Sequence, residues 1–470
     1  MSIPKIIHQI WIGPNPKPIN MMNSWKNKHP DFEYILWDDK EIKKRNMTFI
    51  CQQRIYEMEE WCGKADIMRM EILFKYGGIY LDADSFCIEH ISYLIDNYKA
   101  FAGYENEQVR PGLVANGNLG FPPNHPLCKN AISWILQNPI SNIQTGRRAW
   151  MNTGPLLLTN LLKAFNFPDV SILPSYTFLP EHPSGPPYTG HGKVYAYQEW
   201  GSTKQNYHMM NSMTLPTEFT EPKEWVSVLI SSYNTNHKYV VECLDSILNQ
   251  KGYFGMEIVW INDGSNELST KLLERTLKEY EKKMRFTKFV YKKWDKNMGL
   301  TYSLHKGVLL CSHELIIRFD SDDIMLPERI IKQINYMKSD SDCVICGTNI
   351  QFFKVINKEK MITGATNHKE LLTWNEYKNT RSHWIANHPT LCFKKSAVLS
   401  VGNYNINNQL PCEDFELELK LLKKYGKIYN IQEVLLHYRL HEEQVTASPK
   451  FRNPEVLQFR NNFIEEMTKD

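Results

Sequence analysis

Residues 314–323 read Glu-Leu-Ile-Ile-Arg-Phe-Asp-Ser-Asp-Asp, a short apolar run that ends in three carboxylates. The run predicts a buried strand with Asp320, Asp322 and Asp323 at its carboxyl end. Apolar runs at 225–232, 256–261 and 289–291 predict three more strands, and helical patterns at 239–248 and 297–310 lie between strands. This alternation predicts a doubly wound α/β sheet, which binds ligands at the carboxyl ends of its strands.

Three positions in this region have specific expectations. Asp263 follows the strand at 256–261 and precedes a glycine, where its carboxylate can accept hydrogen bonds from a base or a ribose. Asn297 is expected to cap the helix that ends at Leu310. Gly307, inside that helix, is expected to let it pack closely on the sheet.

The first half of the chain carries a second pair of carboxylates after an apolar strand. The patterns predict a buried strand over 3–12, a helix over 64–76 that ends at Gly77-Gly78, and a strand over 79–81. Asp82 and Asp84 follow, and residues two apart in an extended chain point the same way. Two such carboxylates repel each other unless a hard cation lies between them, and a substrate diphosphate can complete its shell. A solvated turn is the alternative for an isolated Asp-x-Asp.

The helix at 64–76 gives this pair a more specific context. Its apolar positions recur at helical spacing and are expected to face the core: Ala65, Met68, Ile72 and Tyr76. Asp66 and Arg69 are three residues apart, so they should share the adjacent face.

Composition excludes several classes of protein. The net charge of +3, without a long block of one sign, argues against a nucleic-acid partner. No signal-peptide pattern opens the chain, and no apolar run approaches the roughly 18 residues of a spanning helix, so a soluble, cytoplasmic protein is expected. The ten cysteines are expected to be buried free thiols. Cys343-x-x-Cys346 lacks the second pair that a zinc site would need.

The chain is expected to hold two domains, over 1–215 and 216–470. The stretch from 204 to 224 is polar, has no apolar periodicity and is predicted to be a linker or a surface crossing. A loop dense in proline and glycine is expected at 182–190.

The first half resembles glycosyltransferase family 32 and the core of the clostridial glucosylating toxins, over about residues 1–203. The opening Ile3-Pro-Lys-Ile-Ile-His-Gln-Ile-Trp-Ile-Gly13 and the segment from Ala65 to Asp84 carry the resemblance. It implies that Trp11 stacks on the nucleotide base, that Asp66, Arg69 and Tyr80 hold the donor, and that Asp82 and Asp84 hold the diphosphate and a metal ion. Asn116, expected in a polar loop, would touch the sugar. Glu199 and Ser202 would close the metal shell, although Gln198, Glu199 and Lys204 stand where many members have His and a final Trp.

The second half is similar to glycosyltransferase family 2, over about residues 225–448. The matching segments are 226–234, Asn262-Asp-Gly-Ser265, Asn297-x-Gly299, Phe319-Asp-Ser-Asp-Asp323, Cys412-Glu-Asp-Phe-Glu-Leu417 and Tyr438-Arg-x-His441. This resemblance implies that Tyr233, Asp263, Asn297 and Asp320 bind the donor nucleotide. Asp322 would carry the metal, with His441 as a further ligand; a surface histidine is the alternative.

The catalytic residues would be Asp414, as the general base that takes the acceptor proton, and its neighbour Glu413. Residues 415–421 fit a strand or a helix by pattern. A helix is favoured because Lys423, Lys424 and Gly426 make a good carboxyl end.

Together the two resemblances imply two GT-A type (Rossmann-like) α/β domains in tandem. Each would use a divalent cation, Mn²⁺ or Mg²⁺, and a nucleotide sugar, most simply a UDP-sugar, to extend a glycan. Because family 32 retains and family 2 inverts the anomeric configuration, a bifunctional enzyme is expected. One alternative is a single active C-terminal domain with the first half as an acceptor-binding module. Another is a carbohydrate-binding or scaffolding protein without turnover.

Overall fold

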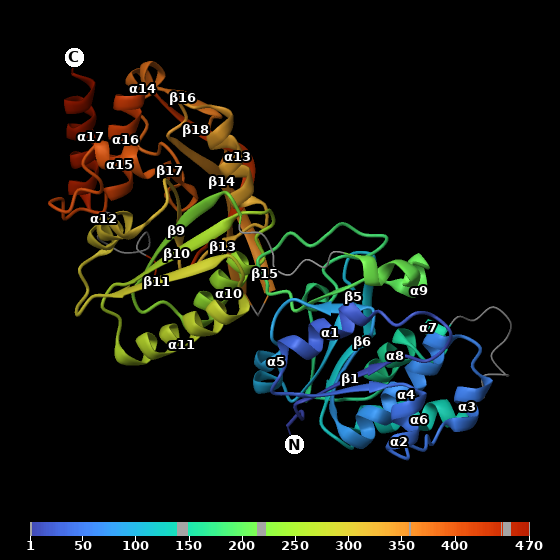
Figure 1. Cartoon of the computed structure of the whole chain (residues 1–470). Coiled ribbons are helices and arrows are strands. Elements are labelled where there is room, and N and C mark those ends of the chain that lie inside the picture. Colours follow the sequence, from blue (N-terminus) through green and yellow to red (C-terminus); the bar gives the residue numbers. More distant parts are fainter. Residues whose placement is uncertain are drawn as a thin grey trace. The chain divides into compact units, whose positions relative to one another are not determined.

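The chain folds into two compact units in a computed structural model. The structure describes residues 2–138, 149–213, 222–356, 359–442, 444 and 453–469. Unit 1 comprises Met1–Tyr188 with Lys193–Phe219, and unit 2 comprises Thr189–Gly192 with Thr220–Asp470 (Figure 1). The expected boundary at 215/216 lies outside the described residues.

Unit 1 is built on a six-stranded mixed sheet with the order β2-β1-β3-β6-β5-β7, and β4 pairs with β8 in a separate ribbon. β1, β2 and β3 are parallel, whereas β6 runs antiparallel to both β3 and β5. The strands are β1 (Ile6–Ile10), β2 (Glu33–Trp37), β3 (Gly78–Leu81), β4 (Ser85–Cys87), β5 (Ala100–Asn106), β6 (Arg110–Phe121), β7 (Val170–Leu173) and β8 (Ala196–Gln198).

Helices cover both faces of this sheet, because alternate strand residues enter two different apolar clusters. Residues of α4, α6 and α8 join one cluster, and residues of α1 and α5 join the other. The helices are α1 (Ile19–Lys28), α2 (Asp39–Lys44), α3 (Gln52–Glu57), α4 (Trp61–Tyr76), α5 (Ser92–Asn97), α6 (Pro126–Gln137), α7 (Ala149–Asn152), α8 (Pro155–Ala164) and α9 (Gly201–Lys204).

Helix α4 begins three residues before the predicted start and ends where predicted, at Gly77, which has a φ of 63°. The expectation that four apolar positions of α4 face the core is confirmed: Met68 and Ile72 are buried in it, and Ala65 and Tyr76 are partly buried and pack against it. The polar residues Asp66 and Arg69 are buried as well. The face of α4 that carries Asp66 and Arg69 lines the cavity described below.

Unit 2 is built on a ten-stranded sheet with the order β11-β10-β9-β12-β17-β14-β18-β13, with β15 paired to β14 and β16 to β18. β11, β10, β9 and β12 are parallel, as the α/β pattern predicted. The strands are β9 (Trp225–Ser232), β10 (Gly255–Asn262), β11 (Thr287–Lys293), β12 (Leu315–Asp320), β13 (Ile324–Met325), β14 (Ile345–Ile356), β15 (Glu359–Ala365), β16 (Leu371–Thr373), β17 (Cys392–Lys394) and β18 (Lys427–Arg439).

The unit 2 sheet is also covered on both faces. Residues of α10, α11 and α13 join one apolar cluster, and residues of α12, α15, α16 and α17 join the other. The helices are α10 (His237–Leu248), α11 (Glu267–Lys283), α12 (Leu300–Leu310), α13 (Arg329–Ser339), α14 (Trp374–Thr380), α15 (Lys395–Ser400), α16 (Glu413–Tyr425) and α17 (Pro454–Thr468).

The structure decides three local expectations in unit 2. Residues 415–421 are helical within α16, and Gly426 ends that helix in the left-handed conformation. A Cβ on Gly307 would collide with Leu229 of β9, so this glycine does allow close packing. Asn297 does not cap α12, whose N-cap is Gly299; the Asn297 Oδ1 instead accepts from the Gly299 N–H at 3.0 Å, within the preceding loop.

The predicted linker or surface crossing at 204–224 contains a short structured part. Residues Tyr207–Ser212 form a 3-10 helix, and Met210 is fully buried in an apolar cluster of unit 1 with Met21, Phe86 and Ile88. Scattered methionines carry no helical or strand period, so their burial could not be predicted from the pattern. Residues 214–221 lie outside the described part of the chain.

All ten cysteines are free, and nine are buried while Cys62 is exposed. The Cys343 thiol lies 3.4 Å from the Met337 sulfur, inside the core of unit 2. None of the helices in the described ranges is long and apolar enough to cross a bilayer.

Candidate functional sites

Unit 1 contains a cavity of about 530 Å³ at the carboxyl ends of β1 and β3. Asp66, Arg69, Asp82 and Asp84 all line it. The adjacent strand ends are fixed by hydrogen bonds: the Gln9 amide donates to the Asp82 carbonyl at 3.1 Å, and the Asp82 N–H donates to the Gly117 carbonyl at 3.0 Å. The sequence therefore brings its four predicted donor and metal residues into one cavity.

Arg69 joins two of these carboxylates. Its guanidinium lies 3.0 Å from Asp66 and 3.3 Å from Asp82, and it donates to the Asn116 carbonyl at 2.7 Å. The side chains of Asp66 and Arg69 are only 7% and 4% exposed, so this pair is rigidly held rather than solvated. Burial raises the pKa of Asp66, although Arg69 favours its charged form. The Asp82 side chain is more open, at 29%, and is the more accessible of the two carboxylates.

Asp84 is held from the other side of the cavity. Its two oxygens accept from the Gln198 amide at 2.6 Å and from the Gly201 N–H at 2.7 Å. Burial and the charge of Asp82 raise the pKa of Asp84 to about 6. The two neighbouring carboxylates form a place where a cation would relieve repulsion.

Tyr80 and Asn116 lie beside this network. The Tyr80 hydroxyl donates to Asp82 at 3.0 Å, and the Arg69 guanidinium lies 4.3 Å above the Tyr80 ring. The Asn116 amide donates to Asp66 at 2.9 Å. The expectation that Asn116 lies in a loop is wrong, because it lies within β6. β6 pairs with β5 on either side of Asn116, at residues 114–115 and 119–120, and with β3 from Asn118 to Phe121, so this glycine- and asparagine-rich segment stays within the strand.

The remaining predicted residues of unit 1 divide into two groups. Trp11 and Ser202 line the cavity, and the Trp11 ring meets Tyr207 edge-on at 5.5 Å. Glu199 is not among the residues that line it, and its carboxylate pairs with Lys204 at 3.2 Å. Neighbouring residues of an extended segment point to opposite sides, so Gln198 reaches Asp84 while Glu199 points away.

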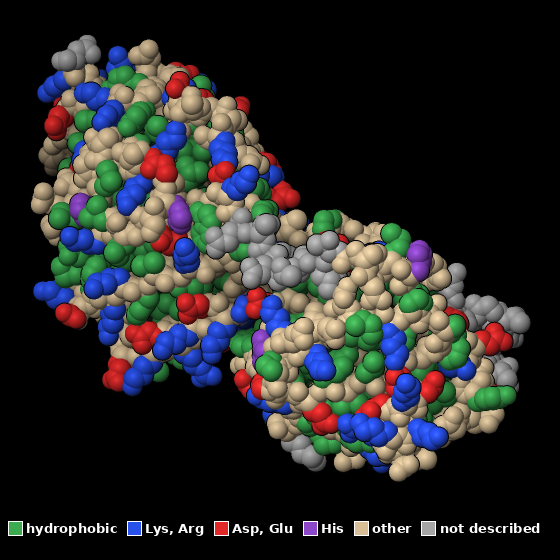
Figure 2. Space-filling model, viewed as in Figure 1, with side chains coloured by type: hydrophobic (Ala, Val, Ile, Leu, Met, Phe, Trp, Pro, Cys, Tyr) green, Lys and Arg blue, Asp and Glu red, His purple; other side chains and the backbone are tan. Residues whose placement is uncertain are grey.

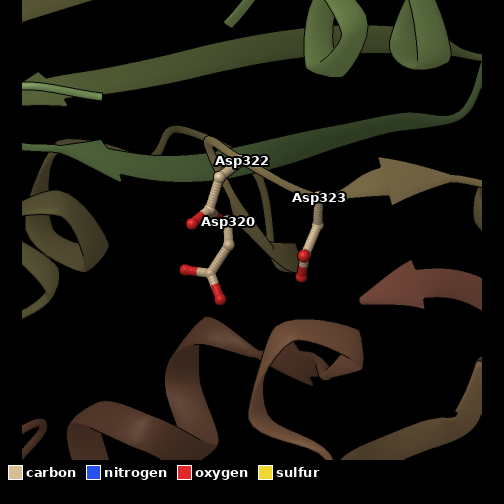
Figure 3. A group of neighbouring side chains, drawn as sticks. All are labelled: Asp320, Asp322 and Asp323. Atoms are coloured by element: carbon tan, nitrogen blue, oxygen red, sulfur yellow. The ribbon is translucent and has the colours of Figure 1, made fainter. Parts of the chain in front are cut away.

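Unit 2 gathers three carboxylates after β12. One oxygen from each of Asp320, Asp322 and Asp323 lies within 4.8 Å of the others. Figure 3 shows the three side chains extending to the same side of the chain. The His441 Nε2 lies 2.8 Å from Asp322, so the predicted Asp322–His441 pair is brought together.

Two buried arginines hold this acidic cluster in place. The Arg318 guanidinium, on β12, lies 2.5 Å from Asp320. Arg439 donates its backbone N–H to Asp323 at 2.8 Å and its Nε–H to the Asp322 carbonyl at 2.6 Å. Burial and the charges of its neighbours raise the pKa of Asp323 well above its usual value.

Asp263, Asn297 and Tyr233 lie in the loops that follow the parallel strands. Asp263 accepts from the Met298 and Gly299 N–H groups at 2.8 and 3.0 Å, so it fixes the loop before α12. Burial raises the pKa of Asp263. Tyr233 follows β9 and is 51% exposed, which leaves its ring accessible.

Glu413 and Asp414 begin α16. The Asp414 carboxylate accepts from the Phe415 N–H at 2.7 Å, and the guanidinium of Arg460, on α17, lies 3.7 Å away. Burial and the charge of Asp414 raise the pKa of Glu413 to about 7, with smaller effects of Arg318 and Asp320.

Comparison with known proteins now adds to this geometry. The sequence model of "Glycosyl transferase family 2" matches residues 227–397. The chain is 31% identical over 220 residues to the amylovoran biosynthesis glycosyltransferase AmsE of Erwinia amylovora, an alignment that covers 47% of this chain and 77% of that protein. The chain belongs to glycosyltransferase family 2.

This glycosyltransferase carries a second region in its first half. The sequence model described as "Glycosyltransferase sugar-binding region containing DXD motif" matches residues 16–101. The inositol phosphoceramide mannosyltransferase 3 of Schizosaccharomyces pombe is 31% identical over 171 residues, which cover 35% of this chain and 46% of that protein. The solved structure of S. aureus TarS 1–349 in complex with UDP aligns at a TM-score of 0.38 and 16% identity, over 51% of this chain and 64% of that one. The expected resemblances of the two halves to glycosyltransferase families are thus confirmed, as is the α/β fold class.

The donor atoms of the glycosyltransferase suit a divalent cation better in unit 2 than in unit 1. Asp320, Asp322, Asp323 and His441 offer hard oxygens and one imidazole, a set suited to Mn²⁺ or Mg²⁺. The buried Asp323 Oδ2 has no hydrogen-bond partner, which fits a carboxylate aimed at a cation. In the described part of unit 1 no comparable group of three ligands occurs, since Glu199 is directed elsewhere.

Sequence reasoning missed three side chains that act on these sites. Gln198 holds Asp84, Arg318 holds Asp320, and Arg460 approaches Asp414. Arg318 could have been found, because a charged residue inside an otherwise apolar strand needs a buried partner. Arg460 could not, because it is distant in sequence from Asp414 and lies on a separate helix.

The face in Figure 2 shows Lys, Arg, Asp and Glu side chains interspersed over both units.

Proposed function

We propose that this glycosyltransferase is bifunctional, with one nucleotide-sugar site in each unit. The supporting observation is that each unit gathers its own carboxylates at the carboxyl ends of its own sheet: Asp66, Asp82 and Asp84 in unit 1, and Asp320, Asp322 and Asp323 in unit 2. Open α/β sheets bind their ligands at this position.

In unit 1, the proposed donor lies in the 530 Å³ cavity, with its base against Trp11. Asp66, Arg69 and Tyr80 hold the ribose and sugar, and Asn116 lies close enough to contact the sugar through the same network. Asp82 and Asp84, with Ser202, face the diphosphate. Glu199 can join them only if it leaves Lys204.

In unit 2, Asp263, Tyr233 and Asn297 are the proposed contacts to the nucleotide, and Asp320 supports the ribose or diphosphate. Asp414 is the proposed base that takes the acceptor proton, because a sugar hydroxyl is a poor nucleophile without one. Glu413 shares the start of α16 with Asp414, and the neighbouring carboxylate helps to raise the pKa of Glu413 to about 7.

A divalent cation is the proposed cofactor of both units. Asp322 and His441 would hold it in unit 2, and Asp82 and Asp84 would hold it in unit 1. When bound, it stabilises the charge that builds on the leaving diphosphate. The donors are proposed to be UDP-sugars, and the acceptor a glycan or a glycosylated molecule. A cytoplasmic location is proposed from the ten free cysteines, which suit a reducing compartment.

The two transfers are proposed to differ in stereochemistry, with retention in unit 1 and inversion in unit 2, as the two resemblances imply. One polypeptide could then add two different linkages to the same glycan. Tethering raises the local concentration of the first product near the second site.

A second candidate is a single active site in unit 2, with unit 1 serving to bind the acceptor. It is favoured by one observation: both oxygens of Asp84 are already bound by Gln198 and Gly201, and Glu199 points away from the cavity.

Nucleotide release from a panel of sugar nucleotides with Mn²⁺ tests both candidates. Wild type is compared with Asp82→Asn/Asp84→Asn and with Asp322→Asn. Two donors, each lost with a different variant, would support two working sites. One donor, lost only with Asp322→Asn, would leave unit 1 as a binding module. Equal turnover in all three proteins would contradict both candidates.

A further inference from the structure

Five side chains on one wall of the unit 1 cavity have no place in the donor site described above. They are Glu105, Arg110, Trp150, His182 and Trp200, here named the distal wall, and all of them line the cavity. Glu105 lies at their centre: the Arg110 Nε is 3.3 Å from its carboxylate and the His182 Nε2 is 3.5 Å away. The Glu105 and His182 side chains are only 10% and 5% exposed.

Two aromatic rings extend this polar centre. The Arg110 guanidinium lies 5.1 Å above the Trp150 ring, and the His182 ring meets Trp200 edge-on at 5.1 Å. The Trp200 indole N–H donates to the Glu181 carbonyl at 3.0 Å, which fixes the ring beside His182. The distal wall is therefore one connected set of contacts.

Two of the five side chains, Glu105 and Arg110, lie on the hairpin of β5 and β6. Glu105 is near the end of β5 and Arg110 begins β6 (Figure 1), and the turn between them is held because the Asn106 Oδ1 accepts from the Gln108 and Val109 N–H groups at 3.0 and 2.9 Å. Glu107, which follows Asn106, accepts from the Ser175 N–H at 2.8 Å. This hydrogen bond ties the turn to another segment of unit 1. Side chains held on such a frame are suited to recognising a fixed shape.

Both ends of the wall meet the carboxylates of the donor site. At one end, Trp200 precedes Gly201, whose N–H donates to Asp84. At the other end, Gly154 packs against the Trp150 backbone, and a Cβ on Gly154 would lie 3.0 Å from Asp66. Both ends of the distal wall are therefore adjacent to residues of the donor site.

The chemistry of the distal wall suits an uncharged sugar. Glu105 and Arg110 compensate each other's charge, so neither a phosphate nor a free carboxylate is favoured there. The carboxylate, guanidinium and imidazole offer acceptors and donors for hydroxyl groups, and the two tryptophans offer apolar surface for the C–H faces of a pyranose. Such a combination of flat apolar surface and few oriented polar groups is typical of specific small-molecule sites.

We propose that the distal wall is the acceptor subsite of unit 1 and binds the terminal, uncharged pyranose of the glycan to be extended. The proposal rests on the proposed transferase function of unit 1. The acceptor hydroxyl then faces the donor sugar inside the cavity, while Asp82 and Asp84 hold the diphosphate.

The test uses the full chain with Asp322→Asn, so that only unit 1 turns over donor. Nucleotide release is measured with the donor alone and with methyl glycosides of glucose, galactose and mannose. We expect at least one glycoside to accelerate release. Glu105→Gln and Trp150→Ala should each raise the KM for that glycoside by about tenfold, the loss of roughly one hydrogen bond or apolar contact, and by more than they change the KM for the donor.

Arg110→Ala is a second variant that keeps the test valid if a buried change fails to fold, since the Arg110 side chain is 42% exposed. The matched control is Tyr56→Ala. Tyr56 is an aromatic residue of α3 that is 80% exposed and does not line the cavity. The proposal is overturned if the wall variants raise the donor KM as much as the glycoside KM, because the wall would then belong to the donor site. It is also overturned if the protein with an unchanged distal wall hydrolyses the donor in unit 1 but no glycoside accelerates nucleotide release.

A failure of the proposed function looks different. If unit 1 releases no nucleotide at all, saturation-transfer NMR with the same methyl glycosides still measures the wall directly. Signal that disappears in Trp150→Ala but persists in Tyr56→Ala would support sugar binding without transfer. Equal signal in both variants would overturn the subsite.

Discussion

Gly117 has no side chain, and the carboxylate of Asp82 occupies the space where a Cβ would lie. A Cβ built on Gly117 falls well inside 3.0 Å of the Asp82 Oδ2. Gly117→Ala should therefore displace the carboxylate, and a misplacement of about 1 Å near reacting groups can cost on the order of 100-fold in rate. Nucleotide release by unit 1 measures the effect. Gly103→Ala is the matched control, because its Cβ would meet nothing closer than 3.9 Å. Equal activity of the two variants would contradict a role for the position of Asp82.

The buried imidazole of His8 makes the free energy of unfolding depend on pH. Its ring, fully buried in β1, bonds to the Gly77 carbonyl at 2.8 Å and accepts from the Trp37 N–H at 3.0 Å. Burial lowers the pKa of His8 to about 4. The unfolded chain binds this proton below about pH 6.5, whereas the folded chain binds it only near pH 4. The contribution of His8 to the free energy of unfolding is therefore present above about pH 6.5 and is lost as the pH falls toward 4, by about 1.4 kcal/mol per pH unit.

His8→Gln should remove this dependence. Denaturant unfolding of unit 1 at several pH values between about 6.5 and 4 measures the slope of the free energy of unfolding for both proteins. The variant is expected to be less stable at neutral pH and to have the shallower loss on acidification. Parallel curves for wild type and variant would show that the His8 proton is not linked to folding.

Helix α17 carries Arg460, whose positive charge lies near Asp414, the proposed base of unit 2. Phe463 and Ile464 bury α17 in the same core as α16, and the Arg460 guanidinium lies 5.1 Å above the Phe415 ring and donates to the His383 carbonyl at 3.0 Å. A nearby positive charge favours the charged form of a carboxylate. Arg460→Met should therefore remove the charge that pairs with Asp414 and lower the turnover of unit 2 by about tenfold. Arg460→Lys, which keeps the charge, should recover part of the rate, whereas an equal loss in both variants would indicate a packing role alone.

The elements themselves were largely predictable, and the exceptions have physical reasons. The strands before Asp82 and Asp320 and the helix at α16 follow from apolar periodicity and a glycine cap, which are local signals. Asn116 in β6 and the buried Met210 were missed because neighbouring strands and a distant cluster, not local propensity, decide their structure. The position of Asp84 against Gln198 joins segments far apart in sequence, so spacing alone could not reveal that Glu199 would point away.

At the scale of the whole molecule, the division into two units predicts separate responses to ligand. Each unit has its own apolar clusters and its own carboxylate site, so calorimetry should show two unfolding transitions. UDP with Mn²⁺ at about 100 times its dissociation constant stabilises a binding unit by about 2.7 kcal/mol. For units of this size, that shift is on the order of 5–10 °C in Tm. Asp82→Asn/Asp84→Asn should abolish the shift of one transition and Asp322→Asn that of the other. If either variant removes both shifts, or if one transition describes the whole chain, the two sites are coupled and the tandem arrangement does not work as two independent enzymes.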